Sequence, residues 1–295
     1  ILIPVSLLFV FLTFLKKKFS KPRVFKLPII CIGNIYIGGT GKTPTSIFLA
    51  KEILKLGKKT AILRKYYENH KDEYNLINKN FKNLILNKNR IDALKKLEKS
   101  DCDLVILDDG FQDFRIKKDL NIICFNQNQL VGNGLVLPSG PLRENLIALK
   151  RANIVIINGK KDKKFEDKIL NINKDLDILY SSYTPLNIEE FKNKKLLAIA
   201  GIGNPENFFK LLSEYGLKIE KKLIFPDHHV FSNKEIQNFI NESKNKNYQI
   251  VMTEKDFYKI SDYNLKDIKY LKVSLEIKEK EKLLNKIKKL YDKNN

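Results

Sequence analysis

The chain has 295 residues, of which 43% are hydrophobic and 30% are charged. This length suits one or two domains, and this composition excludes a wholly disordered or fibrous protein. Lysine and arginine total 55 against 34 acidic residues, and the resulting formal net charge of +21 indicates an anionic partner unless the lysine runs are simply solvated faces.

The first nineteen residues differ in character from the rest of the chain. Residues 1–15 are almost wholly apolar, and Lys16-Lys17-Lys18 follows them at once, the reverse of a secretion signal. As a helix, residues 1–15 would be about 22 Å long, short of the roughly 30 Å hydrocarbon core of a bilayer. We therefore expect residues 1–19 to form a membrane-associated helix that enters one face of a membrane. A buried core helix is the alternative.

Short apolar runs with the length of strands then recur, separated by segments with the length of helices. This alternation predicts an α/β fold with a parallel sheet flanked by helices. The pattern of residues 45–56, which Gly57 terminates, predicts a helix. The expected strands are residues 29–32, 60–63, 84–86, 104–107, 121–125 and 154–157.

A second series of elements begins after a further strand at residues 178–183. We expect a boundary near residue 190. The larger domain, residues 20–190, contains the glycine-rich segment 38–43 that is typical of a P-loop, and a smaller α/β domain of residues 191–295 is expected to complete its active-site cleft. In the smaller domain, Ser232 and Glu235 form a predicted capping box at the start of a helix. Its other expected elements are strands 196–200, 249–253 and 270–275 and a helix over residues 205–215.

The segment Gly38-Gly39-Thr40-Gly41-Lys42-Thr43 lies between the expected strand 29–32 and the helix that starts at Thr45. In such a loop the glycines let backbone N–H groups surround a phosphate, the lysine contacts the β and γ oxygens, and the threonine hydroxyl reaches magnesium. Tyr36 replaces the first glycine of the standard eight-residue pattern, and Ile37 stands where partitioning ATPases have lysine. The loop still predicts nucleotide binding.

The run Leu104-Val105-Ile106-Leu107 ends in Asp108-Asp109-Gly110. An apolar strand that ends in carboxylates is typical of a Walker B element, which holds magnesium directly or through water. The alternative is a strand that ends in a solvated turn. Together with the glycine-rich loop, this run predicts a phosphotransferase that uses ATP and Mg²⁺.

A P-loop GTPase or metal-insertion NTPase is the competing function. Its support is Asn158-Gly159-Lys160-Lys161-Asp162, which is close to the Asn-Lys-x-Asp guanine reader but has one residue too many. The sequence has no cluster of cysteines and histidines that could bind a metal for insertion into a partner. The excess of basic residues does not indicate a nucleic-acid groove either, because the arginines are not clustered and no aromatic stripe accompanies them. We therefore expect no nucleic-acid partner. No protein partner is implied.

Five segments follow one another in order along the chain. They are Gly33-Asn34 with the loop 38–44, Asp108-Asp109-Gly110-Phe111-Gln112, Gly140-Pro141-Leu142-Arg143-Glu144, Asp227-His228-His229 and Thr253-Glu254-Lys255-Asp256. Taken together, these segments resemble the tetraacyldisaccharide 4′-kinase family of lipid A biosynthesis. The resemblance extends over about residues 1–290, and it implies ATP, Mg²⁺, a lipid disaccharide 1-phosphate acceptor phosphorylated at its 4′-hydroxyl, and a helix in the cytoplasmic face of the inner membrane.

The resemblance also implies roles for individual residues. Lys42, Asp72 and His228 would be catalytic, with Asp72 as the base. The loop from Gly38 to Thr43 would bind the nucleotide. Thr43, Asp108, Asp109 and Glu144 would hold the metal, and Asn34 and Arg143 would bind substrate. Arg143 and Glu144 are alternatively a structural ion pair, and His229 is expected to support His228.

The sequence departs from the family pattern in one region. The usual Ser-Arg-Gly-Tyr-Gly turn is Leu63-Arg64-Lys65-Tyr66-Tyr67 here, and Gly-Asp-Glu-Pro is Lys71-Asp72-Glu73-Tyr74. The acidic pair survives although its neighbours do not. His70, in the polar stretch between these segments, is expected to be solvated.

Overall fold

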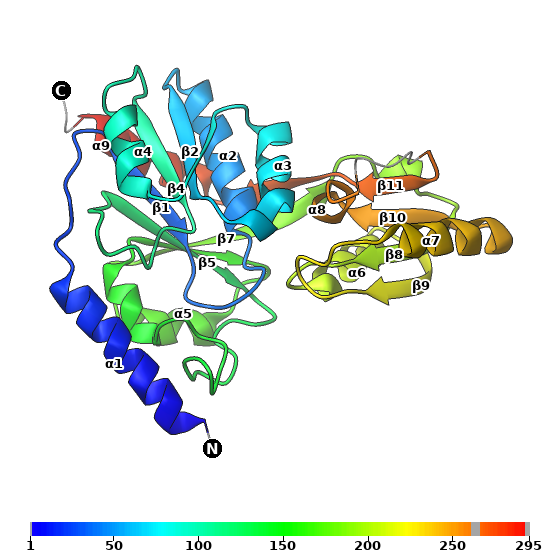
Figure 1. The fold of residues 1–295 in the computed structure, drawn as a ribbon, viewed down its shortest axis with the longest axis horizontal. Coiled ribbons are helices and arrows are strands. Elements are labelled where there is room, and N and C mark those ends of the chain that lie inside the picture. The colour runs from blue at the N-terminus through cyan, green and yellow to red at the C-terminus, as the bar shows by residue number, and fades with distance from the viewer. Residues whose placement is uncertain (1, 261–265, 293–295) are drawn as a thin grey trace. The chain divides into compact units, whose positions relative to one another are not determined.

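Two compact units form the structure, a computed structural model that describes residues 2–260 and 266–292 (Figure 1). Unit 1 comprises Ile1–Tyr66, Phe81–Ser182 and Ile277–Asn295, and unit 2 comprises Tyr67–Asn80 and Tyr183–Glu276. The chain therefore passes between the units four times. The boundary expected near residue 190 divides the chain only once. It therefore assigns residues 67–80 to the first domain and residues 277–295 to the second, whereas the structure groups them the other way round.

Unit 1 is built on an eight-stranded sheet with the order β12-β7-β6-β5-β1-β4-β2-β3. The central strand β1 pairs in parallel with β4 on one side and with β5 on the other. Strands β2 and β6 extend the parallel pairing outwards. The strands are β1 (Ile29–Gly33), β2 (Thr60–Lys65), β3 (Leu84–Asn87), β4 (Leu104–Asp108), β5 (Leu120–Asn126), β6 (Ile154–Asn158), β7 (Asp177–Pro185) and β12 (Val273–Ile277).

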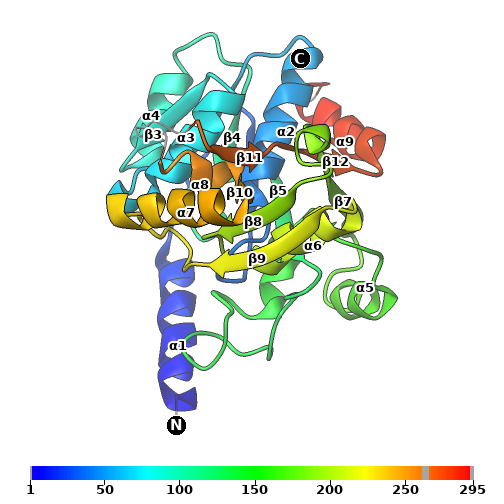
Figure 2. The ribbon, with the colours of Figure 1, turned by 90° about the vertical axis from the view of Figure 1, so that its right-hand side faces the viewer.

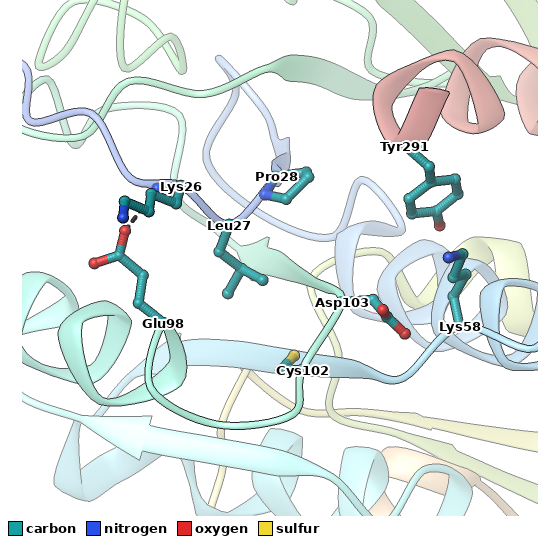
Figure 3. A pocket seen from close by; sticks show the side chains of 8 residues that line it. All are labelled: Lys26, Leu27, Pro28, Lys58, Glu98, Cys102, Asp103 and Tyr291. Atoms are coloured by element: carbon teal, nitrogen blue, oxygen red, sulfur yellow. Dashed lines mark hydrogen bonds between the residues drawn. The ribbon is translucent and has the colours of Figure 1, made fainter. Parts of the chain in front are cut away.

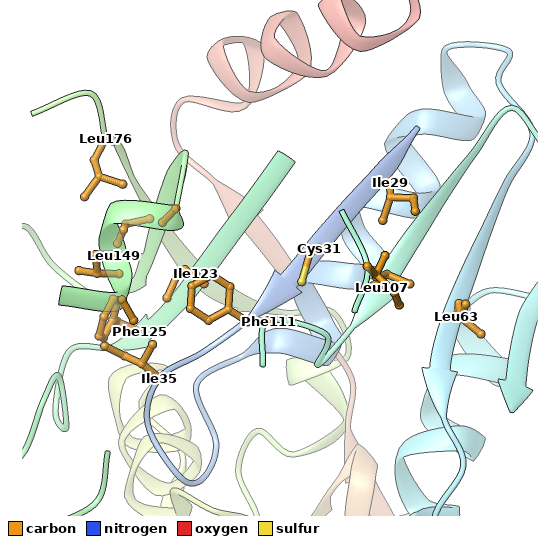
Figure 4. Packing of buried hydrophobic residues seen from close by; sticks show 14 of the residues in the cluster. Ile29, Cys31, Ile35, Leu63, Leu107, Phe111, Ile123, Phe125, Leu149 and Leu176 are labelled. Atoms are coloured by element: carbon orange, nitrogen blue, oxygen red, sulfur yellow. The ribbon is translucent and has the colours of Figure 1, made fainter. Parts of the chain in front are cut away.

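Both faces of this sheet are covered, which explains why its central strands are continuously apolar. Ile29 and Cys31 point into a cluster that also contains residues of α4 (Arg90–Leu97), α5 (Lys163–Leu170) and the 3₁₀ helix η2 (Leu146–Arg151) (Figure 4). Ile30 and Ile32 face the other way, because side chains alternate along a strand, and they are fully buried too. The remaining helices of unit 1 are α1 (Ile3–Phe19), α2 (Lys42–Lys55) and α9 (Lys280–Asp292).

The amino-terminal helix α1 keeps most of its apolar side chains exposed. Its one buried residue is Ser6, whose hydroxyl donates to the carbonyl of Val136 at 2.9 Å and lies 2.8 Å from Ser139 Oγ. The helix is therefore not the buried core helix considered as an alternative. Across residues 2–260 and 266–292, we find no helix with both the length and the apolar content required to cross a bilayer.

Unit 2 contains a four-stranded parallel sheet with helices on both faces (Figure 2). One face packs on α6 (Pro205–Glu214) through Phe208, Phe209 and Leu212, and the other packs on α7 (Asn233–Lys246) through Ile236, Phe239 and Ile240. The strand order is β11-β10-β8-β9. The other elements are α3 (Lys71–Asn80), η1 (Glu68–His70), η3 (Ile188–Glu190), β8 (Lys195–Ala200), β9 (Lys218–Ile224), β10 (Gln249–Thr253), α8 (Glu254–Phe257) and β11 (Ile268–Leu271).

The predicted fold class, a P-loop-like parallel sheet flanked by helices with a second α/β part, is confirmed. The capping box at Ser232 and Glu235 is also present. The single strand expected over residues 270–275 is wrong: β11 ends at Leu271 in the smaller sheet, and β12 begins at Val273 in the larger one. Lys272 separates them because its backbone bonds to residues 186 and 187.

Candidate active site

The glycine-rich loop, residues 38–43, joins central strand β1 to the first turn of α2. Gly38 and Gly41 have φ values of 111° and 86°, which a side chain would disfavour. Asn34 Nδ2 donates to Thr40 Oγ1 at 3.0 Å and so ties the strand end to the loop. Asn34 Oδ1 is buried and accepts no hydrogen bond within the described part of the chain. Asn34 Oδ1, beside the loop, is thus an acceptor for a ligand or water.

Lys42 and Thr43 are the first residues of α2, directly after the left-handed Gly41. Lys42 Nζ lies 3.9 Å from Asp109 Oδ1, and 12% of the Lys42 side chain is exposed. Burial lowers the pKa of Lys42, Asp109 opposes this shift and Arg143 adds to it. A nearly buried ammonium at a helix N-terminus, next to a glycine-rich loop, is a favourable place for a phosphate.

Asp108 ends β4 and is fully buried. Thr43 Oγ1 donates to its Oδ2 at 3.2 Å, and Ser46 Oγ donates to its Oδ1 at 3.0 Å. Arg64 pairs with Asp108 Oδ2 as well and donates to Thr43 Oγ1 at 3.2 Å. Arg64 ends up here because β2 is in register with β4, with residue 64 opposite residue 108. No role was predicted for Arg64 from the sequence, and the one signal that could have suggested it is the position of Arg64 at the end of a predicted strand.

Asp109 has a φ of 55°, in the left-handed region, so its side chain leaves the line of β4. Arg143 Nη1 donates to its two carboxylate oxygens at 2.9 and 3.2 Å. Arg90 donates to the carbonyls of residues 108 and 109, which fixes the backbone of this turn. Burial raises the pKa of Asp109, but the charges of Lys42 and Arg143 outweigh it and hold that pKa well below its usual range.

Glu144 is nearly buried and belongs to a neighbouring group of polar side chains. Arg151 Nη2 donates to its two oxygens at 2.9 and 2.8 Å. Gln112 Nε2 bridges from Glu144 Oε1, at 3.1 Å, to the carbonyl of Asn34, at 2.9 Å. Gln112 was not predicted, although it lies in the segment that the sequence singled out. Glu144 is thus paired with Arg151, and its metal-binding role stays a prediction.

The residues near the loop fit a magnesium ion that is bound mainly through nucleotide phosphates. Within residues 2–260 and 266–292, no three histidine, cysteine, aspartate or glutamate side chains gather as a metal site. Magnesium bound with a nucleotide needs only one or two protein ligands besides phosphate and water. The Thr43 hydroxyl and the Asp108 carboxylate are adjacent and supply that number.

In unit 2, Asp72 and His228 lie together although they are far apart in the sequence. His228 Nδ1 lies 3.0 Å from Asp72 Oδ2 and 3.3 Å from Oδ1. This pairing favours the tautomer in which Nδ1 carries the proton. Only 4% of the Asp72 side chain is exposed. His228 has a φ of 61°, a strained conformation of the kind that clusters at functional sites.

Several charges set the protonation of Asp72. Burial raises its pKa, but the hydrogen bond from His228 and the charge of Lys255 lower it by more, so the pKa of Asp72 lies below its ordinary value. Asp72 also sits in the first turn of α3, where the helix dipole favours a negative charge. Asp72 is therefore an ionised acceptor at neutral pH.

The other two histidines differ from each other. His229 Nε2 lies 3.0 Å from Glu235 Oε1, and its ring stacks on Phe225, so it supports the entry to α7. His70 was expected to be solvated. Its ring instead stacks on His228, with centroids 4.7 Å apart and planes inclined by 14°, and only 30% of its side chain is exposed. The expectation for His70 is wrong because η1 and α3 pack against the Asp227–His228 turn.

A cavity of about 290 Å³ lies elsewhere in unit 1 (Figure 3). It borders residues that precede the amino ends of β1, β2 and β4, whereas the glycine-rich loop and Asp108 are at the carboxyl ends of β1 and β4. Ligands of parallel α/β sheets bind at the carboxyl ends, so this cavity is not the candidate active site. Its lining is Lys26, Leu27, Pro28, Lys58, Glu98, Cys102, Asp103 and Tyr291.

Comparisons with known proteins agree with this geometry. The tetraacyldisaccharide 4′-kinase of Pelagibacter ubique is 40% identical over 100% of this chain and 94% of its own length. That of Haemophilus influenzae is 30% identical over 95% of this chain and 86% of its own. The structure of "apo" form LpxK from Aquifex aeolicus in complex with ATP superposes with a TM-score of 0.74, covers 98% of each chain and is 24% identical.

A parallel sheet whose central strand enters a glycine-rich loop, with Asp108 at the end of the adjacent strand, defines a P-loop nucleotide-binding protein. Its relatives in the preceding comparison are kinases, so the enzyme is a phosphotransferase. The chain belongs to the Tetraacyldisaccharide-1-P 4′-kinase family, which it matches over residues 1–292. These matches do not favour the GTPase or metal-insertion alternative.

Proposed function

We propose that this protein transfers the γ-phosphoryl group of ATP to the 4′-hydroxyl of a tetraacyl disaccharide 1-phosphate, a step in lipid A biosynthesis. The observation that carries the proposal is the loop with Lys42, Thr43 and Asp108 in a chain that matches the kinase family over residues 1–292. The relative from Aquifex aeolicus was solved in complex with ATP, which supports the choice of nucleotide.

Unit 1 supplies the charges for phosphoryl transfer. Loop N–H groups and Lys42 bind the β- and γ-phosphates, while Thr43, Asp108 and Asp109 would hold Mg²⁺. Magnesium neutralises charge on the phosphates when it is bound. Arg143 pairs with Asp109 and contributes positive charge for a phosphate of the nucleotide or the acceptor. Asn34 would accept a hydrogen bond from the substrate through its buried Oδ1. Such positioning and charge neutralisation provide most of the catalysis in this reaction class.

Unit 2 supplies the proton acceptor. As the 4′-oxygen bonds to phosphorus and the bond from phosphorus to the β–γ bridging oxygen breaks, the hydroxyl proton passes to Asp72 and ADP leaves. His228 orients the carboxylate through Nδ1, 3.0 Å away. The depressed pKa of Asp72 makes it a weak base, but the hydroxyl becomes far more acidic as its oxygen bonds to phosphorus, so a positioned carboxylate can still accept the proton.

The proposed location is the cytoplasmic face of the inner membrane. The exposed apolar side chains of α1 would lie among the acyl chains, and Lys16, Lys17 and Lys18 in its last turn would meet anionic headgroups. This monotopic arrangement brings the enzyme to an acceptor that is itself a membrane lipid.

The test is transfer from labelled ATP to lipid disaccharide 1-phosphate in detergent, with GTP as the comparison nucleotide. Wild-type protein is expected to label the lipid with ATP and poorly with GTP. Asp72→Asn keeps the size of the side chain and a hydrogen-bond acceptor but removes the base, so kcat should fall at least 100-fold. ATP affinity and the melting temperature should hold.

Three results would contradict separate parts of the proposal. No lipid labelling by the wild-type protein would remove the kinase assignment itself. Equal or better use of GTP would refute ATP as the phosphoryl donor. Near-normal kcat for Asp72→Asn would leave the kinase intact and refute only the role of Asp72 as base.

A further inference from the structure

Lys255 is surrounded by three carboxylates from two separate segments of unit 2. Its Nζ lies 2.9 Å from Asp227 Oδ1, 3.4 Å from Asp72 Oδ2 and 3.5 Å from Glu73 Oε1. Only 15% of its side chain is exposed. A single ammonium therefore links the start of α3, which carries Asp72, to the turn that carries His228.

The position of Lys255 is fixed by its own backbone. It lies in α8, whose N-cap is Thr253, and the Thr253 hydroxyl accepts a hydrogen bond from the N–H of Asp256 at 3.1 Å. Asp256 is fully buried and accepts a hydrogen bond from the N–H of Gly201 at 2.8 Å. The helix is thus anchored to the carboxyl ends of β8 and β10, and its first turn presents Lys255 to α3.

The neighbouring cation, Lys259, has a different task. Its Nζ lies 2.7 Å from Asp256 Oδ1, donates to the carbonyl of Gly201 at 2.9 Å, and is 4.0 Å from Asp72. It compensates the buried Asp256 and only secondarily faces Asp72. Lys255 is therefore the main lysine counter-charge for Asp72.

Loss of the Lys255 ammonium would remove a charged link between α3 and the turn that carries His228. Asp227 accepts the backbone N–H of His228 at 3.0 Å through the same Oδ1 that Lys255 contacts. Without the ammonium, Asp72, Glu73 and Asp227 would face one another as like charges. The contacts that would remain between the turn and α3 or η1 include the His228–Asp72 hydrogen bond and the stacking of His228 on His70.

We propose that Lys255 is a positioning residue, whose ammonium holds the Asp227–His228 turn against α3 so that His228 stays bonded to Asp72. This inference rests on the proposed function of Asp72 as the proton acceptor. It assigns a task to the Thr253-Glu254-Lys255-Asp256 segment, which the roles derived so far leave unexplained.

The experiment compares Lys255→Met, Lys255→Arg and the control Lys221→Met. The control removes the same charge from unit 2 at a surface pair with Glu242. The charged groups near the Asp72–His228 pair are Glu73 on α3, Asp227 in the turn, Lys255 and Lys259 at α8, and His70 on η1.

For Lys255→Met we expect kcat at pH 7 to fall about tenfold or more, because misplacing a catalytic group by an ångström has effects of this size. The ATP dissociation constant should stay within about twofold. The acidic limb of the kcat profile should move to higher pH by about one unit, since an opposite charge this close lowers a carboxyl pKa by that order. Lys255→Arg should restore the limb, and Lys221→Met should leave it in place.

A readout independent of turnover is the imidazole NMR titration of His228, which should lose its Nδ1 hydrogen-bond signature in Lys255→Met and keep it in Lys255→Arg. An unchanged acidic limb with an unchanged His228 signal in folded Lys255→Met would overturn the inference. If that variant does not fold, Lys255→Gln removes the same charge, and the same two signals decide the outcome. Activity retained by Asp72→Asn would instead contradict the proposed base, so the two failures are distinguishable.

Discussion

Replacing Arg64 by methionine should destabilise unit 1, because Arg64 is the buried partner of a buried carboxylate. Asp108 is fully buried, and the Arg64 side chain is 5% exposed. Breaking a buried ion pair by removing one partner costs about 3–5 kcal/mol, because the other charge is left uncompensated. Asp108 would keep the hydrogen bonds from Thr43 and Ser46, which places the expected loss of unfolding free energy at the lower end, about 3 kcal/mol.

The assay is urea unfolding at pH 7 combined with hydrogen exchange of the β2 and β4 amides, because a protein of two units need not unfold in one step. Arg64→Met with Asp108→Asn removes both charges and should recover about 1–2 kcal/mol relative to Arg64→Met alone. Lys163→Met is the control. The side chains of Lys163 and its partner Asp167 are both more than half exposed, so this change should cost under about 1 kcal/mol.

Two results would refute this reasoning. A loss below about 1 kcal/mol for Arg64→Met would show that Asp108 is compensated by other means. A double variant less stable than Arg64→Met would show that packing, and not the unpaired charge, dominates.

Three further predictions concern the loop, the helix α1 and acid stability. Lys42→Ala should lower kcat by about 100-fold or more with the melting temperature retained, and unchanged kinase activity would refute the assignment of the loop. Deleting residues 1–15 should move protein from the membrane to the soluble fraction and raise KM for lipid, whereas continued sedimentation with membranes would exclude α1 as the anchor. Because the pKa of Asp109 is lower in the folded protein than its unfolded value of about 3.9, its stabilisation is present above about pH 4 and is lost as the pH falls further. Urea unfolding at pH 3 and pH 7 should show a smaller loss for Asp109→Asn than for wild type, and equal losses would contradict this.

The parts of the site that local sequence patterns predicted are those encoded by neighbouring residues, whereas Asp72 and His228 were assigned through the family resemblance. The loop from Gly38 to Thr43 and the strand that ends in Asp108 each need only a local pattern, and the sheet order then places them side by side. Arg64 could not be assigned because its role depends on the register of β2 with β4. His70 was mistaken for a solvated residue because its partner, His228, is far away in the sequence.

Some elements that the sequence pattern joins are separate in the structure. Residues 270–275 look like one strand, yet their hydrogen bonds go to two sheets, and the long-range hydrogen bonds of Lys272 with residues 186 and 187 mark the break. β9 was not predicted at all, because four of its seven residues are charged, and such a segment suits an exposed edge strand as well as a loop.

The path of the chain at residues 67–80 has a consequence for anyone who wishes to dissect or recombine this protein. Asp72 is encoded between β2 and β3 of unit 1 but folds with unit 2, where it meets His228. A fragment cut at residue 190 would carry His228 without Asp72, and its counterpart would carry Asp72 without His228. Exchange of unit 2 between relatives therefore requires two inserts, residues 67–80 and 183–276, to be transplanted together. A chimera that moves only the second insert would pair one parent's carboxylate with the other parent's imidazole, and its residual activity would measure how well the two lineages still match at that bond.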